Sequence, residues 1–542
     1  MSALADNLII APIILPLLAG IATLLLGEPR RNVKAGINVA ASFTLVAIAV
    51  ALLVKADTAE GLVGVYRLGD WAAPFGIVLV ADRLSAMMLL LTAILGSAAV
   101  VFSLARWHRA GAHFHSLFQF LLMGVNGAFL TGDLFNLFVF FELLLVASYG
   151  LALHGSGAAR VRAGLHYIVV NLAASLLFLI GVSLIYAVAG TLNMADLAAR
   201  IPGIAAEDRP LLEAGAAILG TAFLLKAGMW PLCFWLPTAY AAAAAPVASV
   251  FAILTKVGVY VLLRLWLLLF GDGAGASAQF GGDWLLYGGL ATVAFGAIGS
   301  LASQDMARLA AFSVLVSSGT ALAAIGLGQA GVTGGALFYL ASSTLGVGAF
   351  FLLVELVERG REPGADVLAV TREAYGEGEE EIDEEDEVGL AIPATLGALG
   401  VAFIGCAVII AGLPPLSGFI AKFALLSAAL NPAGAAGQHV PPGAASWLLL
   451  VVLVVSGLAA LIAMTRAGIR VFWAAPDRSV PRIRVIEIAP VAALLLLCVW
   501  QTVQAGPVMR FMQATADSLH APQDYVREVL KPGAAPSGGA ER

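Results

Sequence analysis

Long apolar runs, separated by short polar segments, make up most of the sequence. Fourteen of them are long enough, or nearly so, to cross a hydrocarbon core, which needs about 20 residues per helix. The longest run, 391–430, could hold two helices but is counted as one broken crossing, because the charge alternation of the loops requires it. The pattern predicts an all-α integral membrane protein with about 14 transmembrane helices. The runs are 8–26, 37–54, 84–104, 117–130, 134–153, 166–189, 212–232, 247–270, 284–302, 309–327, 336–357, 391–430, 447–464 and 485–503.

The composition excludes a soluble protein. The chain of 542 residues is 61% hydrophobic and 12% charged, whereas soluble domains carry about a quarter charged residues. Ten Asp and Glu residues lie in one stretch, 373–387, and without them the net charge of −6 would become mildly basic. This stretch belongs to the longest predicted inside loop, 358–390, where a solvated spacer is favoured over a docking surface. The acidic balance therefore indicates no substrate, and no nucleic-acid partner is expected.

The Lys and Arg residues of the short loops predict the orientation. With the N-terminus outside, most Arg residues fall in inside loops, and the outside loops 271–282 and 431–446 contain no Lys or Arg. Both termini are therefore predicted outside. The first run has no basic segment before it and no cleavage site after it, so we expect a retained helix rather than a signal peptide. The polar tail 517–542 is expected to be frayed.

Four ionisable residues interrupt the centres of apolar runs. Glu142 stands in FFELLL, Lys226 in AFLLKAGMW, Lys256 in AILTKVGVY and Lys422 in GFIAKFALL. An ionisable group at membrane depth is costly and is a functional candidate by default. The chain has six lysines against 23 arginines, and half of the lysines are these three. A buried lysine can cycle between charged and neutral forms whereas arginine cannot, so the pattern favours proton transfer over fixed ion pairs.

Two other charged residues of the apolar runs are ranked lower. Arg264 and Glu355 lie nearer to the ends of their predicted helices. Long side chains at helix ends can reach the interface, so a location at membrane depth needs no functional role for these two residues.

Prolines beside two of the lysines predict broken helices. Pro231 and Pro237 follow Lys226, and Pro414 with Pro415 precedes Lys422 by seven to eight residues. Proline frees backbone carbonyls within a membrane helix, and broken helices are typical of transport sites near the midplane. A simple packing kink is the alternative at either site.

Motifs for redox, ATPase or hydrolase chemistry are absent from the sequence. There is no GxGxxG in a strand-to-helix context, no Walker A motif, no HExxH and no histidine pair that could hold a haem. Cys233, Cys406 and Cys498 lie in apolar surroundings without CxxC spacing, which is typical of small buried hydrophobic residues. We therefore expect no cofactor and no enzymatic activity, and energy coupling through protons, ions or a partner subunit.

The helix order suggests an internal repeat. Runs four to eight (117–270) and nine to thirteen (271–465) form units of five helices, and an odd number requires the second to be inverted relative to the first. Inverted repeats are typical of transporters. Each unit places a buried lysine in a proline-interrupted fourth helix, Lys226 and Lys422. Helices one to three (1–116) and a C-terminal segment (466–542) flank the two units.

Five stretches resemble the antiporter-like proton-translocating subunits of respiratory complex I, membrane-bound hydrogenases and Mrp-type cation/proton antiporters. They are TGDLFNLFVFFELL, LLKAGMWPLCFWLP, LTKVGVYVLLRLW, SQDMARLAAFS and GLPPLSGFIAKF. Within that superfamily, TKVGVY, CFWLP and the acidic loop are most similar to the D subunits of Mrp-type (Pha or Mnh) antiporters. The resemblance implies fourteen helices with two inverted five-helix repeats, and a bacterial cytoplasmic membrane location. It also implies roles in proton translocation for Glu142, Lys226, Lys256 and Lys422.

Two positions depart from that pattern. Cys233 and Ser342 stand where many relatives have histidines, so bound water would have to bridge the proton path there. The leading hypothesis is a subunit of a multisubunit antiporter that exchanges protons for Na+ or K+, with partner subunits supplying most of any cation site. The alternatives are a proton-pumping subunit of an NADH:quinone oxidoreductase or related redox complex, and a membrane scaffold that transports nothing. The choice between Na+ and K+ is left open.

Overall fold

The computed structural model describes residues 7–58, 63–71, 73–359, 394–431, 441–472 and 483–531. From residue 360 onward, the predicted acidic loop lies outside the described residues. The helices are α2 (Ala11–Leu25), α3 (Arg31–Thr58), α4 (Arg83–Ser103), α5 (Phe114–Leu130), α6 (Leu134–Ala152), α7 (Ala158–Ala189), α8 (Met194–Arg200), α9 (Arg209–Ala227), α10 (Leu236–Ala242), α11 (Ala245–Leu269), α12 (Gly282–Ala302), α13 (Met306–Leu327), α14 (Ala330–Glu358), α16 (Ala394–Ala411), α17 (Ser417–Leu430), α18 (Ala444–Phe472), α19 (Val485–Val503), α20 (Ala505–His520) and α21 (Gln523–Leu530). The strands are β1 (Gly64–Arg67) and β2 (Val78–Ala81).

The described helices form the predicted all-α membrane architecture. Among the described residues, 12 helices are long and apolar enough to cross a membrane, and α2, α5 and α17 are shorter apolar helices. With α16 and α17 taken as two parts of one broken crossing, these helices coincide one by one with the apolar runs of the sequence. The number of crossings, the repeat units and their boundaries stay predictions.

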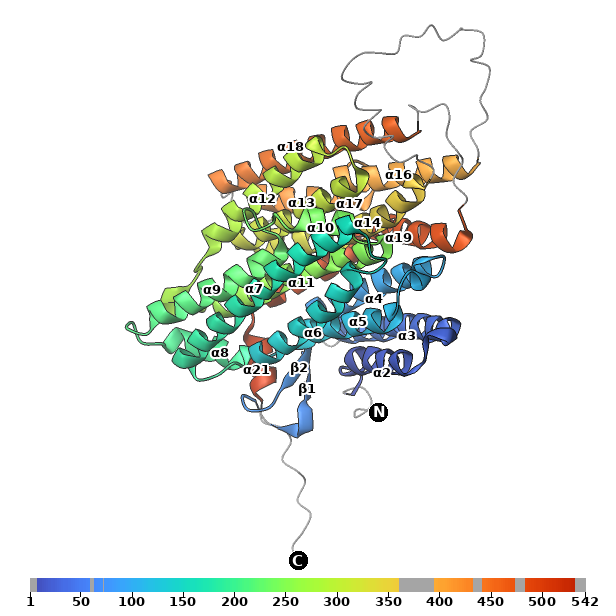
Figure 1. The fold of residues 1–542 in the computed structure, drawn as a ribbon. Helices are drawn as coiled ribbons and strands as arrows, with labels where there is room; N and C mark the ends of the chain where they lie inside the picture. The colour runs from blue at the N-terminus through green and yellow to red at the C-terminus, as the bar shows by residue number, and fades with distance from the viewer. Residues whose placement is uncertain are drawn as a thin grey trace, which may run out of the picture.

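Two helices form the centre of the bundle. The most apolar windows of α11 and α14 are 100% buried, whereas those of α16 and α18 are 33% buried. Figure 1 shows α11 and α14 between α2 and α3 on one side and α16 and α18 on the other. α11 packs on α4, α9, α13 and α14, and α14 packs on α16, α17, α19 and α20. Residues in these windows of α11 and α14 therefore lie inside the protein, away from lipid.

Local sequence fixes where several helices begin and end. Asp82 caps α4 through a reciprocal capping box with Ser85, and Asp133 accepts hydrogen bonds from the first backbone amides of α6. Gly228 ends α9 in the left-handed conformation with φ of +73°. Asp133 and Gly228 thus set the ends of the helices that contain Glu142 and Lys226.

The C-terminal region differs from the prediction. The expectation of a frayed tail from residue 517 is wrong for 517–531, because α20 continues to His520 and α21 follows it. Met512, Ala516 and Leu519 make one buried face of α20, and Tyr525 and Val529 are buried on α21. The polar composition of this segment gave no indication of a packed helix, because an amphipathic helix needs only one apolar stripe to pack. Residues 532–542 lie outside the described residues.

A short antiparallel hairpin, which the sequence did not indicate, closes the same end of the molecule. β1 and β2 pair in the register Val65↔Val80 and Tyr66↔Leu79. Figure 1 shows the hairpin beside α21. We call this end, which includes the first turn of α4, the hairpin end.

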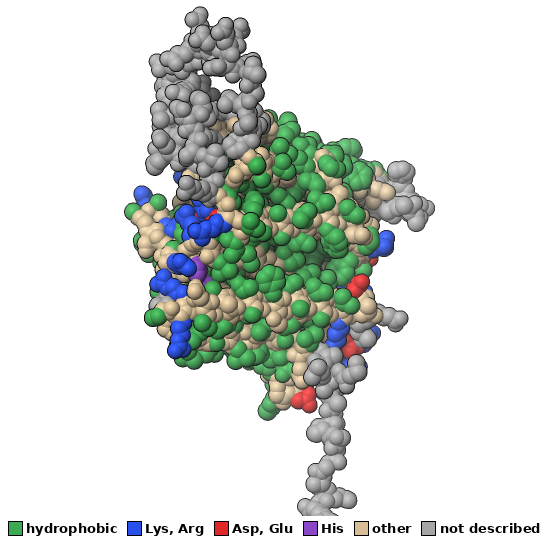
Figure 2. Space-filling model, turned by 90° about the vertical axis from the view of Figure 1, so that its right-hand side faces the viewer, with side chains coloured by type: hydrophobic (Ala, Val, Ile, Leu, Met, Phe, Trp, Pro, Cys, Tyr) green, Lys and Arg blue, Asp and Glu red, His purple; other side chains and the backbone are tan. Residues whose placement is uncertain are grey.

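The surface has the distribution that a bilayer requires. In Figure 2, hydrophobic side chains cover a broad band between two margins where the charged side chains gather. Lys and Arg dominate one margin, and the other has both signs of charge. Many large apolar residues of the molecule are exposed, for example Leu18, Leu176 and Val454. Lipid is the medium that such a band matches.

Candidate functional site

Glu142 lies in the middle of α6, eight residues after the helix begins at Leu134. Its side chain is half-buried, and its Oε1 has no hydrogen-bond partner among the described residues. Residue 141, next to it, is a buried phenylalanine that packs on Phe223 of α9, with ring centroids 5.4 Å apart. This aromatic contact joins the helix of the glutamate to the helix of the first lysine.

Lys226 is buried in the last turn of α9, one residue before the helix ends. Its ammonium lies 5.0 Å from the centre of the Phe141 ring. Among the described residues, the Nζ atom has no hydrogen-bond partner. No hydrogen bond in the described structure joins this ammonium to the Glu142 carboxylate. The contact between α6 and Lys226 is thus made by Phe141, the residue next to Glu142.

The break after Lys226 is satisfied by other groups. The chain leaves α9 at Gly228 and resumes as α10 at Leu236. The indole Nε1 of Trp235 donates to the Leu225 carbonyl at 3.3 Å, and the Trp230 amide donates to the Thr292 hydroxyl at 2.8 Å. Backbone groups freed within a membrane must find such partners. Lys226 is thus not needed to stabilise this break.

Lys256 lies on the central helix α11 and is almost completely buried. Its ammonium donates to the Ser318 hydroxyl of α13 at 3.1 Å. Gly258, two residues further on, allows α9 to approach closely, because a Cβ there would lie 2.8 Å from the Ala227 backbone nitrogen. This contact fixes α11 against the end of the helix that holds Lys226.

Lys422 lies at the second break, between α16 and α17. Its ammonium donates to the carbonyl of Ala411, the last residue of α16, at 2.9 Å. Gly412 turns the chain with φ of +75°, and a Cβ there would lie 2.6 Å from Lys422 Cδ. The lysine therefore occupies the negative end of the α16 dipole.

Pairs of serines connect α14 to α17, the helix of Lys422, and α13 to α14. Ser342 of α14 and Ser417 of α17 are 2.7 Å apart, and Ser317 and Ser343 are 2.6 Å apart. Ser318, next to Ser317 on α13, accepts the hydrogen bond from Lys256. Among the described residues, no three or more His, Cys, Asp or Glu side chains are grouped to hold a metal ion. Cys233 is buried.

The model of the NADH:quinone oxidoreductase/Mrp antiporter membrane family matches residues 131–437. A relative from Rhizobium meliloti (strain 1021), named as the D subunit of a probable K(+)/H(+) antiporter, is 60% identical over 99% of both chains. The chain belongs to this family. The D subunit of the Na(+)/H(+) antiporter of Bacillus subtilis (strain 168) is 33% identical, over 97% of this chain and 100% of the relative.

Solved structures agree with the family assignment. A chain of the Mrp complex from Dietzia sp. DQ12-45-1b matches with a TM-score of 0.80 and 27% identity, covering 97% of this chain and 99% of that one. A chain of respiratory complex I from Thermus thermophilus matches with a TM-score of 0.73 at 22% identity, covering 96% and 99% of the two chains, which is a likeness of fold. In this member of the antiporter family, the fold and the family were thus predicted correctly from the sequence.

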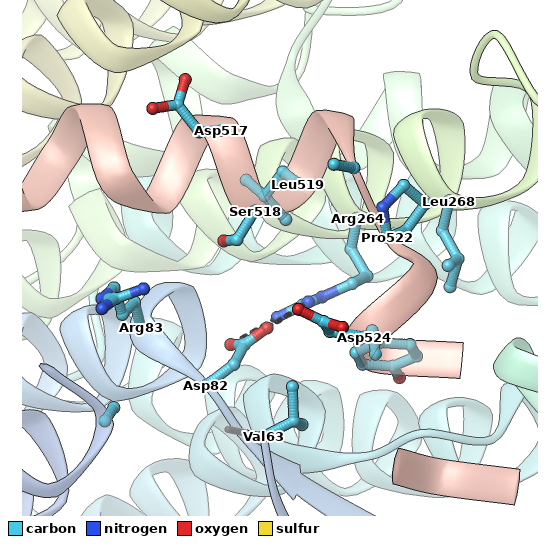
Figure 3. Close-up of a pocket in the computed structure, with 13 residues that line it drawn as sticks. Val63, Asp82, Arg83, Arg264, Leu268, Asp517, Ser518, Leu519, Pro522 and Asp524 are labelled. Carbon is cyan, nitrogen blue, oxygen red and sulfur yellow. Dashed lines mark hydrogen bonds and ion pairs between the residues drawn. The ribbon is translucent and has the colours of Figure 1, made fainter. Parts of the chain in front are cut away.

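Arg264, which was ranked lower because it could snorkel, is instead buried and paired. It is buried near the end of α11 and forms a two-pronged ion pair with Asp82 at the start of α4. Figure 3 shows this pair on the wall of a cavity of about 170 Å³, which Asp517 and Asp524 also line. Burial opposes ionisation of Asp82, but the Arg264 guanidinium and the Ser85 hydrogen bonds outweigh it and lower the Asp82 pKa. The pair connects α11 to the hairpin end.

Glu355 lies near a helix end, as expected, but it is paired there. It accepts hydrogen bonds from the Trp107 indole and from Arg359, both at 2.6 Å, and Arg359 also binds Glu487 of α19 at 2.5 Å. No sequence signal relates Trp107 to Glu355, because the two residues are far apart along the chain. The cluster ties α14 to α19 and to the turn after α4.

Proposed function

We propose that the chain is the D subunit of a multisubunit cation/proton antiporter, and that protons move along Glu142, Lys226, Lys256 and Lys422. The observation that supports the proposal is the presence of three buried lysines, together with the half-buried Glu142 of α6, on helices linked by packing. α9 packs on α11, α11 packs on α14, and α14 packs on α17. The relatives from Rhizobium meliloti and Bacillus subtilis are both named as antiporter components, which favours the antiporter over a redox-driven pump.

The local chemistry follows from the surroundings of each lysine. A carboxylate within about 4–6 Å stabilises a charged lysine, so approach of Glu142 favours proton uptake by Lys226 and separation favours release. Because no hydrogen bond joins Glu142 to Lys226, the two side chains are free to approach and to separate. The proton passes through hydrated groups toward Lys256 and Lys422, and repulsion between like charges couples it to the cation.

The chain works with partners rather than as an enzyme of its own. We infer that it is a transporter subunit in the bacterial cytoplasmic membrane, with both termini outside. Glu142 is the only carboxylate at the centre of an apolar run, so partner subunits supply most of the cation site. The 60% identical relative is named as part of a K+/H+ antiporter, which makes K+ the ion to test first.

The test uses everted vesicles from antiporter-deficient cells that express this chain with the products of neighbouring genes. The transmembrane pH gradient is recorded as K+ and then Na+ is added. Collapse of the gradient on cation addition, lost in Lys226→Ala, is the expected result. A complex that assembles but gives no collapse would instead support the redox-driven pump, and flavin or iron–sulfur subunits among the gene neighbours would point the same way.

A further inference from the structure

An apolar groove opens beside the central helices, away from the lysines. It has a volume of about 270 Å³ and lies between α3, α4, α14, α19 and α20. Leu90 and Ile94 of α4, Leu345 of α14 and Phe511 of α20 are among its walls. Gln501 of α19 is the one amide, hydroxyl or charged side chain among the residues that line it.

Gln501 is buried and incompletely paired. Its side chain is 7% exposed, and its Oε1 has no hydrogen-bond partner among the described residues. A buried carbonyl oxygen without a donor is unfavourable, so native proteins rarely leave one unsatisfied. The groove therefore offers a place for an apolar chain and one acceptor for a donor attached to it.

The position of Gln501 matches the depth of a lipid headgroup. It lies two residues before α19 ends at Val503, at the hairpin end of the bundle. Its neighbour Trp500 is 54% exposed, and tryptophan is enriched at the level of lipid headgroups. From there, Met87, Leu90 and Ile94 follow α4 toward its middle, at about 1.5 Å per residue.

We propose that this groove binds one phospholipid of the surrounding bilayer, with an acyl chain along the apolar walls and a headgroup N–H or O–H donating to Gln501 Oε1. Lipid is the medium around the apolar band, so it is present at high local concentration. A helix of a partner subunit is the other candidate occupant, and crosslinking from position 90 distinguishes the two. The proposal depends on the membrane location and not on antiport.

The headgroup chemistry gives a direct test on the whole complex. Phosphatidylcholine has no donor in its headgroup, whereas phosphatidylethanolamine has an ammonium and phosphatidylglycerol has hydroxyls. The complex is exchanged into phosphatidylcholine nanodiscs containing a small fraction of either donor lipid, and the lipid that stays bound is measured by native mass spectrometry. We expect one donor lipid to be retained in preference to phosphatidylcholine.

Two variants assign that lipid to the groove. Gln501→Met keeps the volume and removes the acceptor, so donor-lipid retention should fall about fivefold, the effect of one hydrogen bond. Gln504→Met changes an exposed glutamine of the same helix end and should retain the lipid as the native chain does. Leu90→Trp fills the groove and should release donor lipid and phosphatidylcholine alike.

Three results would overturn the proposal. Equal retention of phosphatidylcholine and donor lipids would show that Gln501 accepts no hydrogen bond from the headgroup. Equal loss of donor lipid in Gln501→Met and Gln504→Met would show that the effect is not specific to Gln501. A crosslink from a photoreactive residue at position 90 to a partner subunit, with no lipid adduct, would show that protein covers the groove.

Discussion

The two helix breaks differ in the side chain that donates a hydrogen bond to the backbone carbonyls before the break. At the break after α9, the Leu225 carbonyl accepts hydrogen bonds from the Gly228 amide and the Trp235 indole, and the neighbouring Lys226 ammonium has no hydrogen-bond partner in the described part of the chain. At the break after α16, the Lys422 ammonium itself donates to the freed Ala411 carbonyl. Lys226 thus has no part in stabilising its break, whereas Lys422 stabilises the second break directly.

This difference suggests different roles for the two lysines. Lys226 contacts the ring of Phe141, the residue next to Glu142, and no hydrogen bond in the described structure holds its ammonium. Lys422 rests on a helix end whose partial negative charge is fixed, about half an elementary charge. We therefore expect Lys226 to alternate between its charged and neutral forms. We expect Lys422 to change its charge in response to a proton that reaches it.

Replacement of Lys226 should have the largest effect. Lys226→Ala removes the titrating group without removing any hydrogen bond that the described structure records, so the complex should assemble normally. Antiport measured in everted vesicles should fall by about 100-fold or more, the scale of a lost proton-transfer group. Lys531→Ala, at an exposed lysine after α21, is the matched control and should leave antiport unchanged. Normal antiport in Lys226→Ala would refute the proposed route.

Glu142→Gln should be nearly as damaging. The substitution keeps the shape and removes the charge that acts on Lys226, so the lysine loses the switch between its two states. A neighbouring charge shifts the protonation equilibrium of its partner by about 1–3 pH units, so we expect antiport at a fixed pH to fall about tenfold or more. Glu142→Asp should recover part of the rate. Equal rates for Gln and Asp variants would indicate that the charge is irrelevant.

Gly412→Ala should affect the second break specifically. The residue has φ of +75°, which costs an alanine about 1–2 kcal/mol, and the new Cβ would displace the Lys422 side chain. We expect antiport to fall several-fold and thermal stability of the purified complex to decrease. Gly397→Ala on α16 is the control, because a Cβ there meets nothing within 4 Å. Equal antiport in Gly412→Ala and Gly397→Ala would show that the contact between Lys422 and Ala411 does not contribute to transport.

The transmembrane helices could be predicted from the sequence because a 20-residue apolar run has few alternatives in a membrane. The positions of Glu142 and the three lysines followed from the cost of burying charge. Their partners did not follow, because the Lys422–Ala411 contact depends on how the chain turns at Gly412. The same limit applies to Arg264, since its partner Asp82 is 182 residues away. Helices α20 and α21 were missed because average polarity hides a single apolar face.

The smallest effect is expected at Ser342, where the sequence departs from many relatives. Ser342→Ala removes one hydrogen bond, to Ser417, which contributes about 1 kcal/mol and corresponds to a change of about fivefold or less in antiport. Ser427→Ala, at an exposed serine of α17 bonded only within its own helix, should have no effect. If water bridges the path at Ser342, its hydroxyl is one contact among several, and the loss stays small. A loss as large as that of Glu142→Gln would mean that the second site also depends on one switching side chain, and the contrast between the two breaks would no longer hold.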